Sequence, residues 1–102
     1  MTADQDEQEL RMTLLLYLQR ALLGAISPAL RGVTVGWHDK VVSVICYFHG
    51  SATEEDREAM DDVHTEMLAD LYPEYNVELE VVQIDQPRVM PMLKVWAYRR
   101  RE

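Results

Sequence analysis

Apolar side chains recur every three or four residues near the start of the chain, as on one face of a helix. The stripe consists of Leu10, Leu14, Tyr17, Leu18, Ala21, Leu22 and Ala25. It predicts a helix from about Asp6 to Ile26, capped by Asp4 or Asp6 and ended by Ser27-Pro28. Further apolar residues flank the stripe, namely Met12, Leu15, Leu16 and Leu23. We therefore expect this helix to be buried over more than one face.

Two runs of β-branched and aromatic residues come next. Val33–Trp37 alternates apolar with small or polar residues, whereas Val41–Phe48 is almost continuously apolar. Such runs are typical of strands, and the apolar density of the second run indicates a central strand. His38-Asp39-Lys40 is short enough to form the turn of a hairpin between them.

A second helix is predicted after Gly50. Ser51-Ala52-Thr53-Glu54 fits the capping-box pattern, and the helix should run to about Leu71, before Tyr72-Pro73. Its inner stripe is narrow and consists of Ala59 or Met60, then Val63, Met67 and Leu71. Its outer face carries Glu54, Glu55, Glu58, Asp61, Asp62, Glu66 and Asp70.

The last third of the chain predicts two more strands. Val77–Ile84 alternates apolar and acidic residues, and Met92–Tyr98 follows a loop that contains two prolines. The predicted order is α-β-β-α-β-β within a single domain spanning residues 1–102. This order favours a two-layer α+β fold, with a four-stranded antiparallel sheet and both helices packed on one face.

Charge is distributed unevenly along the chain. The 102 residues hold 18 acids and 10 Lys or Arg, a formal net charge of −8. Residues 54–80 contain eleven of the acids and the single base Arg57, whereas residues 88–101 contain five bases and no acid. The net charge argues against direct binding of nucleic acid or anionic membranes, because both require clustered Lys and Arg. The Arg99–Arg101 triplet would protect a sheet edge or pair with the acidic helix.

The sequence also favours a cytoplasmic protein. A single cysteine, Cys46, allows no internal disulfide bond, and no apolar stretch approaches the roughly 20 residues of a membrane span. The first residues are acidic, whereas a signal peptide would begin with basic residues.

A few residues are candidates for catalysis. Asp61 and His64 lie three residues apart on the second helix, so their side chains can meet. Cys46 lies in an apolar run, where burial would raise the pKa of its thiol. Common nucleophile, phosphate-binding, zinc-protease and calcium-loop motifs are all missing from the sequence, so we expect no cofactor and no metal. A small enzyme or ligand-binding domain using His64, Asp61 and Cys46 is one alternative, and a self-associating structural subunit is another.

The acidic helix is the sharpest feature of the sequence. A solvated face that keeps the protein soluble is the simplest explanation. However, acids spaced four residues apart repel each other by about 0.2–0.5 kcal/mol per pair, and mixed charges would serve solubility as well. A positive partner surface that neutralises the row is therefore the competing explanation.

Several segments resemble small bacterial immunity proteins of contact-dependent growth inhibition systems. These segments are Tyr47–Gly50 leading into Ser51–Asp56, then Thr65–Pro73, Gln83–Pro87 and Val95–Glu102. The resemblance implies a protein without enzymatic activity that binds and neutralises a cognate toxin domain, commonly a nuclease delivered by a neighbouring cell. A nuclease presents Lys and Arg to phosphates, so an acidic inhibitor would complement it.

The expected contact residues follow from this hypothesis. The partner is a basic toxin domain, and Trp37 or Tyr98 would supply an aromatic anchor. The charged contacts would come from Glu54, Glu55, Glu58, Asp61, Asp62, Glu66 and Asp70.

Overall fold

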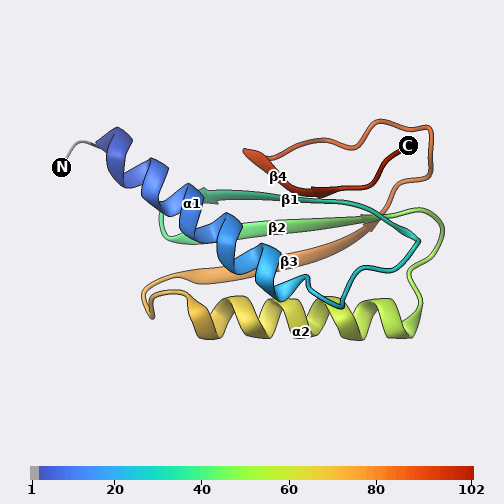
Figure 1. Ribbon diagram of the computed structural model, residues 1–102, viewed down its shortest axis with the longest axis horizontal. Coiled ribbons are helices and arrows are strands. Elements are labelled where there is room, and N and C mark those ends of the chain that lie inside the picture. The colour runs from blue at the N-terminus through green and yellow to red at the C-terminus, as the bar shows by residue number, and fades with distance from the viewer. Residues whose placement is uncertain (1–2) are drawn as a thin grey trace.

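The computed structural model describes residues 3–102, with side chains from Asp6 onward, and contains two helices and four strands (Figure 1). In chain order the elements are α1 (Ala3–Ala21), β1 (Leu30–His38), β2 (Val41–Phe48), α2 (Glu54–Asp70), β3 (Asn76–Gln83) and β4 (Val95–Arg99). The α-β-β-α-β-β order that the sequence patterns predict is confirmed.

The four strands form one sheet in the order β3-β2-β1-β4. Strand β1 pairs antiparallel with β2 and with β4, as expected for a mostly antiparallel sheet. Strands β2 and β3, however, run parallel. The expected four-stranded antiparallel sheet is therefore present except at this one pair. The pair is parallel because α2 carries the chain back along the sheet, and β3 then starts at the same end as β2.

The tight hairpin between β1 and β2 is confirmed. Asp39 and Lys40 both have positive φ, 48° and 63°, as in a two-residue turn whose twist matches that of the strands. β1 begins three residues earlier than its sequence pattern indicates, which places Arg31 within the strand and buries it.

Both helices share one apolar core with the same face of the sheet. From the helices the core takes Leu14, Leu18, Ala21, Leu22, Met60, Val63 and Met67, and from the strands Val33, Val35, Val42, Val44, Cys46, Phe48 and Val77. The strand residues alternate along their strands and are opposite one another in register, for example Val33 and Cys46. The expected two-layer α+β architecture is therefore present.

Helix α1 differs from its prediction. It ends at Ala21, and the chain then turns through Gly24, which has a φ of +78°. Asp6 lies inside the helix and so does not cap it, while the side chain of Asp4 lies outside those that the structure describes. Met12, Leu16 and Leu23 are exposed by 70%, 54% and 80%. The expectation of burial over more than one face was wrong for these three side chains, and of the flanking residues only Leu15 packs partly against the core.

The far face of the sheet is covered in part by the loop between β3 and β4. Tyr47, Ile84 and Met90 form a second, smaller buried cluster there. The tyrosine hydroxyl donates a hydrogen bond to the Pro91 carbonyl at 2.7 Å and so ties the loop to β2. The sequence does not predict that this loop packs on the sheet, because its apolar residues do not recur with the period of a helix or a strand.

Gly32 on β1 allows this cover to approach closely. A Cβ atom at this position would lie 2.9 Å from Cζ3 of Trp96 and 3.2 Å from the sulfur of Met90. Any larger residue would push both side chains away from the sheet.

Within residues 3–102, neither helix is both long enough and apolar enough to cross a membrane.

Candidate interaction surface

Helix α2 is anchored by a capping box two residues later than its sequence pattern suggests. The Thr53 hydroxyl accepts the Asp56 amide at 3.1 Å, and the Asp56 carboxylate accepts the Thr53 amide at 3.1 Å. Partial burial disfavours the charged form of Asp56, but the hydrogen bonds that its carboxylate accepts, led by the one from the Thr53 backbone, together outweigh burial and lower the pKa of this carboxyl. The expected box of Ser51 with Glu54 was wrong, since Thr53 occupies the cap.

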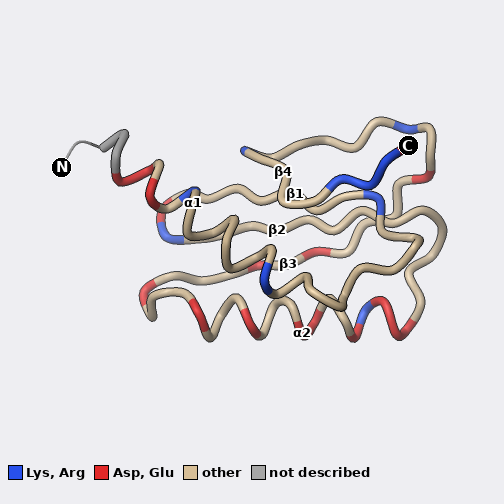
Figure 2. The backbone as a smooth tube through the Cα atoms, in the orientation of Figure 1, with Lys and Arg blue, Asp and Glu red and all other residues tan. Residues whose placement is uncertain are grey.

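The buried stripe of α2 determines which side of the helix faces solvent. Met60, Val63 and Met67 are completely buried against the sheet. Figure 2 marks the positions of the acidic residues along α2 in red. The outward-facing acids are all exposed. They are Glu54, Glu55, Glu58, Asp61, Asp62, Glu66 and Asp70. We call these seven residues the acidic face.

No residue of the acidic face has an ion-pair partner among the side chains from Asp6 to Glu102. The ion pairs of this region involve Arg31, Arg100, Lys94 and His38 as the basic residues, and none of them reaches α2. Arg57, the one base on the helix, forms no ion pair within 4.0 Å either. No ion pair among the described side chains therefore offsets the repulsion within the row.

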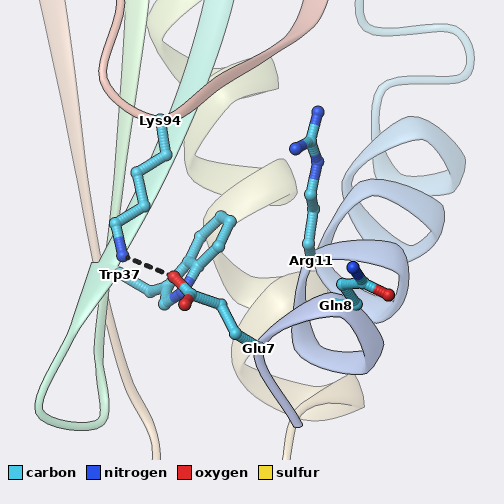
Figure 3. Close-up of a pocket in the computed structure, with 5 residues that line it drawn as sticks. All are labelled: Glu7, Gln8, Arg11, Trp37 and Lys94. Atoms are coloured by element: carbon cyan, nitrogen blue, oxygen red, sulfur yellow. Dashed lines mark hydrogen bonds and ion pairs between the residues drawn. The ribbon is translucent and has the colours of Figure 1, made fainter. Parts of the chain in front are cut away.

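The two aromatic candidates lie away from the acidic face. Trp37 is the penultimate residue of β1 and is half-buried beside the N-terminal half of α1 (Figure 3). The Lys94 ammonium lies 4.5 Å from the ring centroid of Trp37 and 3.2 Å from Glu7 Oε1. Together with Gln8 and Arg11 these residues line a hollow of about 420 Å³. Tyr98 lies on β4, at the edge of the sheet opposite β3, and packs against the main core.

The three candidates for catalysis are not assembled into one site. Nε2 of His64 lies 2.6 Å from the Val77 carbonyl oxygen, to which it donates a hydrogen bond that joins α2 to β3. Cys46 is completely buried in the core, and burial raises the pKa of its thiol to about 12. Asp61 is exposed on the acidic face. Among the described side chains, no three potential metal-ligating residues converge on one point.

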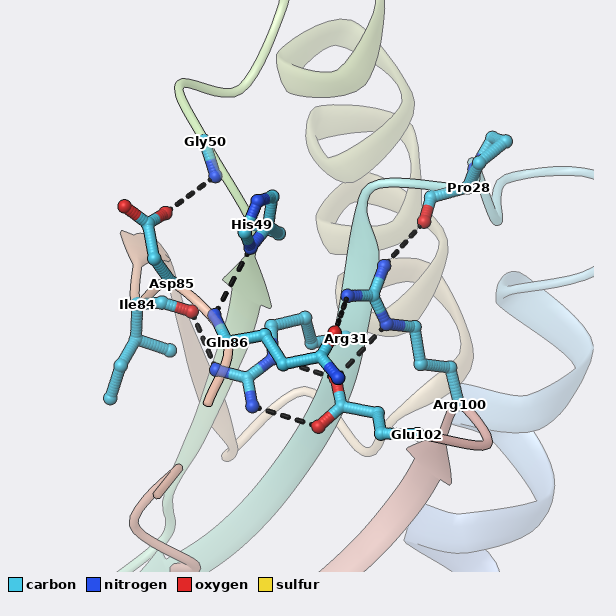
Figure 4. A network of polar contacts seen from close by, with 9 residues as sticks. All are labelled: Pro28, Arg31, His49, Gly50, Ile84, Asp85, Gln86, Arg100 and Glu102. Atoms are coloured by element: carbon cyan, nitrogen blue, oxygen red, sulfur yellow. Dashed lines mark hydrogen bonds and ion pairs between the residues drawn. The ribbon is translucent and has the colours of Figure 1, made fainter. Parts of the chain in front are cut away.

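A polar network holds the C-terminal residues against the sheet (Figure 4). The buried Arg31 guanidinium donates to both carboxylate oxygens of Glu102, at 2.7 and 2.8 Å, and to the Ile84 carbonyl at 2.6 Å. The hydrogen bonds from Arg31, followed by those from Arg100, outweigh partial burial and hold the pKa of Glu102 at about 2.

Two arginines of the triplet make contacts that the sequence patterns do not indicate. Arg100 donates to Glu102 at 3.0 Å, to the Pro28 carbonyl at 2.6 Å and to Gln86 at 3.1 Å. Arg99 lies over the ring of Trp96, 5.3 Å from its centroid. Neither of these two arginines pairs with the acidic helix. Sequence reasoning missed the network because Arg31 and Glu102 are 71 residues apart.

The loop between β3 and β4 presents a second surface that sequence reasoning did not identify. Val89, Met92 and Leu93 are exposed by 86%, 53% and 37%. The last two line a shallow apolar groove with Val41 and Trp37. Neighbouring prolines, Pro87 and Pro91, were the only sequence signal, and they indicate a loop without indicating its exposure.

Comparison with known proteins identifies a family. The sequence model of the family described as MafI2 immunity protein matches residues 11–102. No curated protein matches the chain significantly. The resemblance found in the sequence is confirmed as to the class of protein, an immunity protein.

Proposed function

Because this chain belongs to the MafI2 immunity protein family, we propose that its acidic face binds a cognate toxin domain and thereby neutralises the toxin. The observation that carries the proposal is the set of seven exposed carboxylates without an ion-pair partner among the described side chains. A surface whose charges repel each other gains most when a positive surface covers it. The self-repulsion of α2 is then a cost that binding removes.

The proposed partner is a basic nuclease domain. A nuclease must place Lys and Arg around the phosphates of its substrate, so its cleft is positive. An inhibitor with a net charge of −8 is attracted to such a cleft, and complementary charge accelerates association. The same charge disfavours direct binding of nucleic acid by the immunity protein.

Neutralisation in this proposal needs no catalysis by the chain itself. The cysteine lies in the core, and the helix histidine is engaged by a backbone carbonyl. Occlusion of the toxin is sufficient. The proposal also includes the delivery route that the resemblance implies, from a neighbouring cell into the cytoplasm, where the nucleic acid substrates of a nuclease are found.

Trp37 and Tyr98 are kept in the proposal as aromatic contacts of secondary weight. They lie on β1 and β4, and a toxin domain that reaches them from the acidic face must extend around the sheet. An interface of ordinary size buries about 800 Å² per partner. With that area, a toxin domain contacts both the acidic face and these aromatic residues only if it curves around the immunity protein.

The test is co-purification with the toxin domain encoded next to this chain, followed by measurement of association rates over a range of salt concentrations. The variant Glu58→Lys, Asp62→Lys, Glu66→Lys reverses three charges of the acidic face. We expect it to slow association by about ten-fold or more, with a weaker salt dependence than the wild type.

The matched control reverses three exposed acids away from this face, Glu9→Lys, Asp39→Lys and Glu74→Lys. It changes the net charge by the same amount. If both variants associate equally slowly, the effect is one of overall charge, and the acidic face is not the contact surface. Failure of the wild type to bind the toxin domain would refute the proposed function itself.

A further inference from the structure

The outer edge of β3 carries backbone N–H and C=O groups that form no hydrogen bond with another strand of residues 3–102. The Asn76 amide donates to the Lys40 carbonyl and the Ile84 amide to the Phe48 carbonyl, both at 2.9 Å. These bonds show that even-numbered residues of β3 turn toward β2. The odd-numbered residues from Val77 to Gln83 therefore turn their N–H and C=O groups outward, because backbone groups alternate along a strand.

Only one position of this edge is occupied. The Val77 carbonyl accepts the hydrogen bond from His64, which lies on α2. Within residues 3–102 no strand pairs with the outer side of β3, since the sheet ends there. Leu79, Val81 and Gln83 thus present about three donors and three acceptors in a row.

The edge lacks several of the features that normally prevent a strand from pairing with another molecule, and its protection is limited to the charges of Glu78 and Glu80. β3 has eight residues, contains no proline or lysine, and keeps a regular register with β2. The opposite edge differs: β4 has five residues, its register with β1 is irregular, and Arg99 covers Trp96. One edge of the sheet is therefore protected and the other is open.

We propose that the edge from Leu79 to Gln83 accepts a β-strand of the toxin domain, one that alternates basic and apolar side chains. This inference rests on the proposed function and names the contact through which it acts. Main-chain hydrogen bonds supply affinity in this mode, and alternate side chains supply specificity.

The side chains around the edge select that partner chemistry. Glu78 and Glu80 are exposed on the far face of the sheet, opposite Ser43 and Ile45 of β2, and form no ion pair among the described side chains. Leu79 and Val81 are half-buried on the helix face, next to the core. Basic residues of an added strand would meet the two glutamates, and its apolar residues would cover the two aliphatic side chains.

The acidic face lies on the helix that borders this edge. His64 joins α2 directly to β3, and Figure 2 shows acids on both elements. A strand added to β3 thus enters between two groups of carboxylates. The same charges oppose pairing with a second copy of this chain, because an antiparallel β3–β3 contact would bring Glu78 and Glu80 close to their own counterparts.

Amide hydrogen exchange measured by NMR tests the inference on the wild-type chain, free and in complex with a catalytically inactive form of the toxin domain encoded next to it. In the free protein the amides of Leu79, Val81 and Gln83 should exchange rapidly, and those of Glu80 and Val82 slowly. In the complex the three odd-numbered amides should slow by about ten-fold or more, since new hydrogen bonds protect them.

A pair of variants at one position separates the backbone from the side chain. Val81→Pro removes an outward amide without removing a hydrogen bond to β2, and proline is tolerated at such edge positions. Val81→Ala keeps the amide and shortens the side chain. We expect the proline variant to bind the toxin domain about ten-fold or more weakly than the alanine variant.

The outcomes are distinguishable. A complex in which the odd-numbered amides still exchange rapidly overturns the inference and leaves the proposed function standing. Absence of any complex overturns the proposed function and the inference with it. Protection of these amides in the free protein that rises with protein concentration would assign the edge to a second copy and would also overturn the inference.

Discussion

Replacing Asp62 by lysine should stabilise the folded protein while it weakens toxin binding. Asp62 is exposed in the middle of α2, with Glu58 four residues before it and Glu66 four residues after it. All three carboxylates face solvent, and none has an ion-pair partner among the described side chains. The substitution converts two repulsive neighbours into two attractive ones.

The magnitude follows from this count. A like-charge pair at this spacing costs about 0.2–0.5 kcal/mol, and an opposite-charge pair gains a similar amount. The loss of two repulsive pairs and the formation of two attractive pairs together raise the free energy of unfolding by about 0.8–2 kcal/mol. For a domain of this size the corresponding rise in Tm is about 3–15 °C.

Asp61→Lys is the matched control, since it changes the same charge at the adjacent exposed position. Asp61 lies four residues after Arg57 and three after Glu58. A lysine at this position would repel Arg57 and attract Glu58, whereas Asp61 attracts Arg57 and repels Glu58. The two changes oppose each other, so the net change in stability should be close to zero.

Urea unfolding followed by circular dichroism, at low and at high salt, measures both variants. The advantage of Asp62→Lys should shrink at about 1 M salt, where the Debye length falls to about 3 Å. Equal stability of the two variants at low salt would refute the repulsion argument. Tighter or unchanged toxin binding by Asp62→Lys would refute the assignment of this face to the toxin.

Three further predictions concern the core and the C-terminus. Burial holds the Cys46 thiol protonated, with a pKa of about 12, so iodoacetamide should modify it only after unfolding, as mass spectrometry would detect. The pKa of Glu102 is held at about 2, below its ordinary value of 4.5, so its stabilising contribution is complete above pH 4.5 and is lost as the pH falls toward 2. Unfolding of Glu102→Gln should lack this part of the acid dependence; an unchanged profile would contradict the role of Arg31. Gly32→Ala should cost about 1–3 kcal/mol in urea unfolding, because its Cβ would contact Trp96 at 2.9 Å, and a smaller loss would show that the tryptophan moves freely.

Local patterns in the sequence determined the elements of this protein. The helical spacing of Leu10 to Leu22 and the apolar run Val41–Phe48 each depend on neighbours within a few residues, so their type can be predicted without the rest of the chain. The burial of Cys46 follows from the same run. The exposure of the acidic face also follows from the sequence, because a narrow inner stripe leaves only one side of α2 for the core.

Contacts between distant parts of the chain were decided by the tertiary structure. The parallel pairing of β2 with β3 depends on where α2 returns the chain, and the ion pair between Arg31 and Glu102 joins residues 71 apart. The order of the strands determines which strand edge is left without a pairing partner. The residues of β3 themselves do not indicate that this strand lies at the end of the sheet. The sequence alone therefore determined the charge of the acidic helix. Only the fold placed an unpaired strand edge beside it, because backbone pairing depends on how the strands are arranged in space and leaves no periodic signal in the side chains.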